Sequence, residues 1–163
     1  MNTTLGIQID SRQLGYAVFE GGALIDWGIK DLRLRKKRMT AGTALPLFGK
    51  LIDQYQPDVV VLPTRTRNPN SARSRFLEAI KLELARSTYK PVIYGRREIR
   101  EALGPLIKAK SPSKYPIMKA LVGWFPELQG VLPKPRRRWD PEPYWTPVFD
   151  AVSLAATYLS KQL

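Results

Sequence analysis

The sequence predicts a single mixed α/β domain over residues 1–163, in which helices flank a five-stranded sheet of three antiparallel strands followed by parallel strands. Two observations predict this class. Three short β-type segments come first, and apolar strand-like segments then alternate with amphipathic helical ones. A length of 163 residues is typical of one domain and suffices to bury a proper core.

The first part of the chain predicts an antiparallel meander. Residues 4–10 alternate in a way that is typical of a strand, with Leu5, Ile7 and Ile9 on one face and Gly6, Gln8 and Asp10 on the other. Residues 15–19 predict a second strand, and the turn residues 20–22 lead into a third strand over residues 23–32. Gln8 and Asp10 are therefore either ordinary polar residues at a strand end or groups that face a site.

Helices and two further strands follow the meander. Apolar residues spaced three or four positions apart predict the helices, and short unbroken apolar runs predict buried parallel strands. In chain order we expect a helix opening at Thr40, a strand at 59–62, a helix at 71–88, a strand at 91–94, and helices at 96–103, 114–125 and 148–161. Residues 126–147 hold six prolines and show no clear period, so we expect a long surface connection.

The charge of the chain indicates a polyanionic partner. Twenty-seven Lys and Arg against fourteen Asp and Glu give a formal net charge of +13. Nucleic acid is the commonest partner of such a protein, and an anionic membrane surface or simple solubility are the alternatives. No apolar run reaches the roughly 18 residues of a membrane span, and the N-terminus lacks a signal-peptide pattern, so we expect no membrane insertion and a cytoplasmic location.

The absence of two residue types narrows the chemistry. The chain has no cysteine, which excludes disulfides and thiolate metal sites and agrees with the cytoplasm. It has no histidine, which excludes Ser-His-Asp and Cys-His catalysis, histidine-bound zinc and a histidine general base. Any hydrolysis would therefore depend on carboxylates and a hard cation such as Mg²⁺ or Mn²⁺.

The segment from Leu5 to Val18, LGIQIDSRQLGYAV, resembles the first hairpin of RuvC-type Holliday-junction resolvases, whose pattern is L-G-I-D-x-G-S-R followed by G-Y. The matching residues are Leu5, Gly6, Ile7, Ser11, Arg12, Gly15, Tyr16 and Val18. The family's first metal-binding aspartate falls on Gln8. The resemblance implies a ribonuclease-H-like fold, a homodimer and a nucleic-acid partner.

Further matches follow in the order of the family. They are Gln56-Pro57-Asp58 before an apolar strand, Asn70, Pro91-Val92, Lys114-Tyr115-Pro116-Ile117, and Asp150-Ala151 with Leu154, Ala155 and Thr157. The family's chemistry depends on four acidic side chains around two metal ions. Carried over by position, these acids fall on Gln8, Pro63, Pro147 and Asp150, so that Asp150 alone is kept. Asp10 lies two residues beyond Gln8 and could replace the first acid, with Gln8 as a neutral metal ligand. Glu78, Glu83, Glu98 or Glu101 could add a third ligand, although each is also explained as a helix-surface charge.

Basic residues predict phosphate contacts that need no metal. One set surrounds the expected cleft: Arg12, Arg65, Arg67, Arg73, Arg75, Lys108, Lys110 and Lys114. A second set mixes cations with aromatics: Lys134, Arg136, Arg137, Arg138, Trp139, Tyr144 and Trp145. The second set could stack on unpaired bases, or its aromatics could only pin the proline-rich segment to the core. The run from Arg33 to Arg38 fits either phosphate contact or a solvated surface.

The leading hypothesis is a protein that binds branched or duplex DNA on a RuvC-like fold with a degenerate metal site. One alternative is an active Mg²⁺- or Mn²⁺-dependent endonuclease that uses Asp10 and Asp150. Another is an RNA- or ribosome-associated module similar to the YqgF-like branch of the superfamily. Phosphate contacts alone do not separate DNA from RNA.

Overall fold

The computed structural model describes residues 2–10, 12–31, 41–64, 68, 70–109, 112–137 and 139–163. The elements in chain order are β1 (Thr3–Ile9), β2 (Gln13–Glu20), β3 (Ala23–Asp31), α1 (Ala41–Tyr55), β4 (Val59–Pro63), α2 (Ala72–Ala85), β5 (Lys90–Tyr94), α3 (Arg96–Leu103), η1 (Pro105–Ile107), α4 (Lys114–Trp124), η2 (Pro126–Val131) and α5 (Thr146–Lys161). No helix in the described part of the chain is long and apolar enough to cross a membrane.

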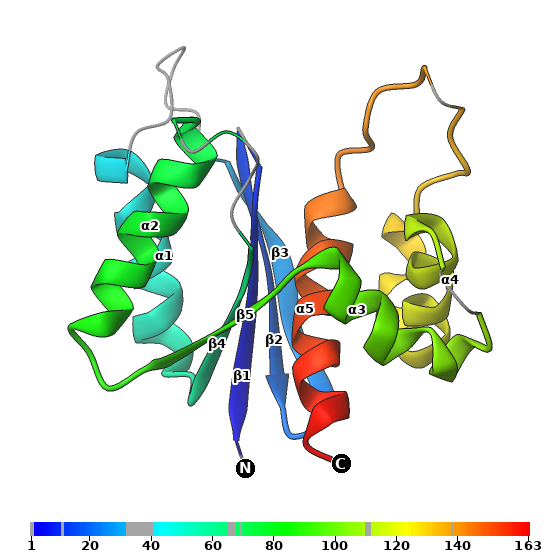
Figure 1. Ribbon diagram of the computed structural model, residues 1–163, viewed down its shortest axis with the longest axis horizontal. Coiled ribbons are helices and arrows are strands. Elements are labelled where there is room, and N and C mark those ends of the chain that lie inside the picture. Colours follow the sequence, from blue (N-terminus) through cyan, green and yellow to red (C-terminus); the bar gives the residue numbers. More distant parts are fainter. Residues whose placement is uncertain are drawn as a thin grey trace.

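The five strands form one sheet in the order β3-β2-β1-β4-β5. The first three pair antiparallel, and β4 and β5 join in parallel on the other side of β1. Helices α1 and α2 cover one face, α5 covers the other, and α3 and α4 lie outside α5 (Figure 1). The predicted mixed sheet is confirmed, and so is its order of antiparallel strands followed by parallel ones.

The core on the α1 and α2 side follows from the alternation in β1. Leu5, Ile7 and Ile9 are fully buried there, and they share a cluster with Phe48 of α1 and Phe76 of α2. The intervening residues of β1 therefore face α5. This geometry places Gln8 on the side of the sheet where α5 begins.

Two glycines allow α5 to lie directly on the sheet. A Cβ on Gly6 would lie 2.3 Å from the carbonyl oxygen of Ala151, and one on Gly15 would lie 2.4 Å from the carbonyl carbon of Pro147. Side chains at these two positions would push the helix away from β1 and β2. The glycines of the opening motif thus bring the first turns of α5, including Asp150, close to β1.

The structure corrects several expected boundaries. α2 ends at Ala85 rather than at residue 88, and α5 begins at Thr146 rather than at residue 148. The proline-rich connection also contains a short 3₁₀ helix, η2, and another, η1, follows α3. Proline is tolerated in the first turn of a helix because its missing N–H would have no partner there, so Pro126 and Pro147 open helices. The helix start expected at Thr40 lies outside the described residues.

Candidate functional site

A cleft of about 930 Å³ opens at the end of the sheet opposite the two termini. It lies where β1 and β4 end and α5 begins, and α2, α3, α4 and the segment between η2 and α5 complete its walls. Its charged lining among the described residues consists of Arg73, Arg96, Arg100, Lys114, Lys134, Arg136, Asp10, Glu142 and Asp150. Six cations against three carboxylates give this surface an excess of positive charge.

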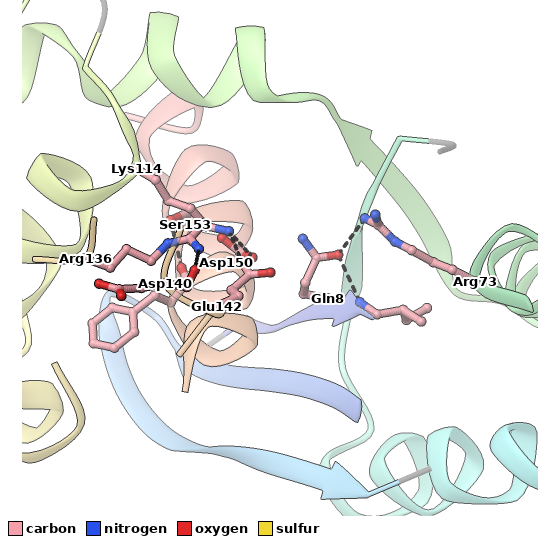
Figure 2. A network of polar contacts seen from close by, with 10 residues as sticks. Gln8, Arg73, Lys114, Arg136, Asp140, Glu142, Asp150 and Ser153 are labelled. Atoms are coloured by element: carbon pink, nitrogen blue, oxygen red, sulfur yellow. Dashed lines mark hydrogen bonds and ion pairs between the residues drawn. The ribbon is translucent and has the colours of Figure 1, made fainter. Parts of the chain in front are cut away.

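The carboxylate of Asp150 is paired with a lysine. Lys114 Nζ lies 3.1 Å from Asp150 Oδ2 and 2.9 Å from Glu142 Oε1, so one ammonium bridges two acids (Figure 2). The side chain of Asp150 is 22% exposed and that of Lys114 is 35% exposed. Lys114, at the start of α4, thus joins α5 to the segment that precedes it.

Burial raises the pKa of Asp150 above its ordinary value, since a charged carboxylate loses hydration in this position. The ammonium of Lys114 acts in the opposite direction, as does a hydrogen bond from Gln8, whereas the negative charge of Glu142 raises the pKa further. Asp150 therefore binds a proton more readily than an exposed aspartate does.

Gln8 is held from the other side by an arginine. Its Oε1 accepts a hydrogen bond of 3.1 Å from Arg73 Nη2 and one of 2.9 Å from the backbone N–H of Ile9. Arg73 reaches this position from the first turn of α2, which packs on the opposite face of the sheet. In Figure 2 the side chain of Gln8 lies between Arg73 on one side and Asp150 with Lys114 on the other.

Arg73 is a partly buried cation whose Nε has no hydrogen-bond partner in the described part of the chain. Burial lowers the pKa of its guanidinium, and the negative charges of Asp150, Asp10 and Glu142 oppose that shift. An arginine stays protonated in proteins, so this group is a fixed positive charge at the carboxyl end of β1. It stands beside the side chain on which the family's first acid falls.

Asp10 lines the same cleft but serves the turn between β1 and β2. Its Oδ1 accepts hydrogen bonds from the backbone N–H of Arg12 at 2.7 Å and of Gln13 at 3.3 Å, and its own N–H donates to the carbonyl of Gln13. Such a turn is a common role of aspartate.

The four positions that the resemblance assigns to metal ligands do come together. Gln8, Pro63, Pro147 and Asp150 all line the cleft. Mg²⁺ requires oxygen ligands, and two neighbouring ions require several negative ones. Among the described residues, no group of three or more His, Cys, Asp or Glu side chains could hold a metal ion. The donor set therefore does not fit a two-metal centre.

The glutamates considered as further ligands do not line the cleft among the residues described. Glu98 accepts a hydrogen bond from the N–H of Gly95 at the start of α3, and Glu101 pairs with Arg97 at 2.8 Å. Glu78 pairs with Lys81 at 3.3 Å. Glu83, near the end of α2, borders a separate hollow that α1 also lines. The alternative explanation, helix-surface charges, accounts for their positions.

The basic residues expected around the cleft fall into three groups. Arg73, Lys114 and Arg136 line it, and Lys134 does so as well. Arg12, Arg75, Lys108 and Arg137 are exposed but are not among the lining residues. Outside the described residues lie Arg65, Arg67, Lys110, Arg138 and the run from Arg33 to Arg38. Ser11 of the opening motif lies outside them as well.

Sequence reasoning missed three charged groups of the cleft. Arg96 and Arg100 lie four residues apart on α3, which begins directly after β5. The place of α3 after a parallel strand could have indicated them, because the carboxyl ends of parallel strands meet at one edge. Glu142 lies in the proline-rich segment, and no local pattern marks it as the partner of Lys114.

The aromatic residues of the second basic set divide between two roles. Trp145 packs edge-on against Trp27 with ring centroids 6.0 Å apart, and it borders the core on the α5 side. Tyr144 leans against Trp145 but is 53% exposed, and Trp139 is 77% exposed. The expected pinning of the segment therefore describes Trp145 and does not describe Trp139.

The fold resembles those of solved Holliday junction resolvases. Thermus thermophilus RuvC superposes with a TM-score of 0.69 at 16% identity, covering 98% of this chain and 95% of that one. The same enzyme with a Holliday junction substrate gives 0.70 at 15% identity, covering 99% and 95%. The yeast mitochondrial Holliday junction resolvase gives 0.64 at 17% identity, covering 98% and 78%.

A fourth comparison extends the likeness to a viral protein. The fowlpox virus resolvase, in a complex with its substrate Holliday junction DNA, gives a TM-score of 0.55 at 16% identity and covers 99% of both chains. No family model and no curated protein matches the sequence. At these identities the likeness establishes a RuvC-like, ribonuclease-H-like fold, as the opening motif predicted.

Proposed function

We propose that the protein binds branched or duplex DNA in this cleft through phosphate contacts and that its metal site is degenerate. Structurally similar proteins bind Holliday junction DNA at 15–16% identity to this chain. The excess of cations over carboxylates in the cleft supports the same kind of partner here.

The observation that carries this proposal is the pairing of the cleft's polar side chains with cations. Arg73 bonds to Gln8, and Lys114 pairs with Asp150. Positive side chains thus contact the oxygens that metal ions would require. Lysine and arginine hold phosphates without any metal, so such a cleft keeps a means of binding nucleic acid. Hydrolysis would still lack the carboxylates that position two ions.

One observation favours a second candidate, a metal-dependent endonuclease. Asp10, Gln8 and Asp150 line one cleft, as that hypothesis requires. Against it, Asp10 Oδ1 already accepts two backbone hydrogen bonds. The candidate therefore requires a metal ion to bind through Asp10 Oδ2, or the turn after β1 to give up those bonds.

A four-way DNA junction tests both candidates in one gel. Labelled junction is incubated with the protein in Mn²⁺ or in EDTA and read for shifted and for cut product. The proposal expects a shift in both conditions and no cut. Asp150→Asn should bind equally or more tightly, because it removes a negative charge near phosphate. Asp53→Asn, at an exposed position on α1, is the matched control and should behave as wild type. Mn²⁺-dependent cutting that Asp150→Asn abolishes would contradict the proposal and establish the endonuclease.

Two further measurements address the partner and the assembly. The resemblance implies a homodimer, whose two-fold axis would match a four-way junction, and light scattering of the free protein measures its mass directly. Competition between junction DNA and structured RNA separates the proposal from the RNA-associated alternative. Stronger displacement by RNA would favour that alternative.

A further inference from the structure

We propose that Trp139 is a stacking platform for an unpaired base, so that the preferred ligand carries unpaired bases beside a duplex. This inference rests on the proposed function, because the cleft must first hold the phosphates of a nucleic acid. It assigns a role to Trp139, which does not itself line the cleft.

Hydrogen bonds join Asp140, which follows Trp139, to Arg136 and Arg137. The N–H of Asp140 donates to the carbonyl of Arg137 at 3.0 Å, which closes a turn. The carboxylate of Asp140 accepts the N–H of Arg137 at 2.8 Å, and the carbonyl of Asp140 accepts Arg136 Nη1 at 2.7 Å. These three bonds stabilise the turn that contains Trp139.

The side chain of Trp139 buries little surface against the fold. Its side chain is 77% exposed, although an indole is among the side chains that gain most from burial. Trp145, six residues later, shows the ordinary outcome, since it packs against Trp27 at the border of the core. The guanidinium of Arg137 lies 5.8 Å from the centroid of the Trp139 ring, and the exposed remainder of the indole is open to solvent.

The charged residues near Trp139 favour a nucleobase as the group that stacks on its ring. Lys134, Arg136 and Arg137 are exposed nearby, while the carboxylate of Asp140 is engaged within the turn. An aromatic ring flanked by cations suits a base with its phosphates, because the ring stacks and the cations neutralise. An apolar protein partner would have to cover these charges.

The position of the turn links the ring to the cleft. Arg136 lines the cleft, and Trp139 follows it by three residues. Three residues of extended chain span at most about 10 Å, which is roughly three nucleotides of a strand at about 3.4 Å each. A base on Trp139 would therefore belong to the same nucleic acid whose phosphates contact Arg136, close to the end of its paired region.

The test compares two ligands of equal length, a blunt duplex and a fork with unpaired arms, by fluorescence anisotropy at one salt concentration. Trp139→Ala should weaken binding of the fork by roughly 5- to 150-fold, the loss of one base–aromatic stack, and should change duplex binding less than about twofold. Trp139→Phe keeps a ring and should recover most of the affinity. Trp124→Ala is the matched control, because Trp124 is a 42% exposed tryptophan at the end of α4, outside the segment between η2 and α5 that carries Trp139.

The outcomes separate this inference from the function on which it rests. Unchanged fork binding by Trp139→Ala, or an equal loss on fork and duplex, would overturn the stacking role while leaving the cleft as the binding surface. Failure of the wild-type protein to bind either ligand would overturn the proposed function and the inference with it. Forks made of DNA and of RNA should show the same relative loss, because stacking uses the face of the base and not the sugar.

Discussion

The salt dependence of binding should reveal how many cleft cations contact phosphate. Each phosphate neutralised contributes about −0.9 to the slope of log K against log salt. The described lining of the cleft has six cations and three carboxylates, which gives limits of three and six effective contacts. The slope should therefore lie between about −2.7 and −5.4, and affinity should fall about 40- to 2,000-fold between roughly 50 and 200 mM salt.

Two adjacent arginines on α3 provide the matched perturbation. Arg96 lines the cleft, whereas Arg97 does not line it and pairs with Glu101 at 2.8 Å on the exposed helix surface. Arg96→Gln should reduce the steepness of the slope by about 0.9, and Arg97→Gln should leave it unchanged. Both variants remove one positive charge, so the total charge of the protein is the same in each.

Fluorescence anisotropy of a labelled duplex, titrated at several salt concentrations, measures the slope. A nearly flat slope for the wild-type protein would refute phosphate binding in the cleft. Equal effects of the Arg96 and Arg97 substitutions on the slope would instead refute the cleft as the site of phosphate contact. They would mean that binding responds only to the overall charge of the protein.

Three further predictions address packing, protonation and the metal site. Gly15→Ala places a methyl group 2.4 Å from backbone atoms of Pro147 in α5, so it should cost about 1–3 kcal/mol and lower the Tm by roughly 2–12 °C in calorimetry. Gly49→Ala in α1, where a Cβ meets nothing within 4 Å, should raise the Tm by a few degrees, and the reverse order of the two Tm changes would contradict the packing. Because the pKa of Asp150 is raised, lowering the pH through that pKa removes a negative charge from the cleft and should tighten DNA binding. Asp150→Asn should lack this part of the pH dependence. An identical pH profile of binding in both proteins would exclude a contribution from Asp150. Gln8→Asp alone should not produce Mn²⁺-dependent cutting, since Arg73 already supplies a cation at that position. The appearance of cut junction would show that one carboxylate added beside Asp150 is enough for cutting.

The fold could be predicted because its determinants are local. The alternation around Leu5, Ile7 and Ile9 identifies a strand and its two faces, and all three residues are buried on the α1 and α2 side. The glycines at positions 6 and 15 lack side chains and so allow α5 to approach the sheet closely. The opening motif contains both glycines, but the packing of α5 on them was not predicted from the sequence.

The site could be predicted only in part, because its contacts join distant segments. The positions of Gln8 and Asp150 followed from the resemblance, and both line the cleft. The partners of these two residues did not follow. Arg73 lies 65 residues from Gln8 along the chain, and Glu142 shares Lys114 with Asp150 across three different segments. No periodicity in a sequence reports such pairings, since they depend on how the completed sheet and helices meet.

The chemistry of Gln8 suits a position that lies between a cation and a carboxylate. Its amide oxygen accepts from Arg73 and from the N–H of Ile9, while on the other side its side chain acts to lower the pKa of Asp150. An aspartate there could only accept, and its charge would stand beside that of Asp150 without a donor between them. Glutamine lies between a cation on one side and a carboxylate on the other and carries no charge itself. Gln8→Asp would therefore remove the neutral group between Arg73 and Asp150 while both Arg73 and Lys114 stay in the cleft.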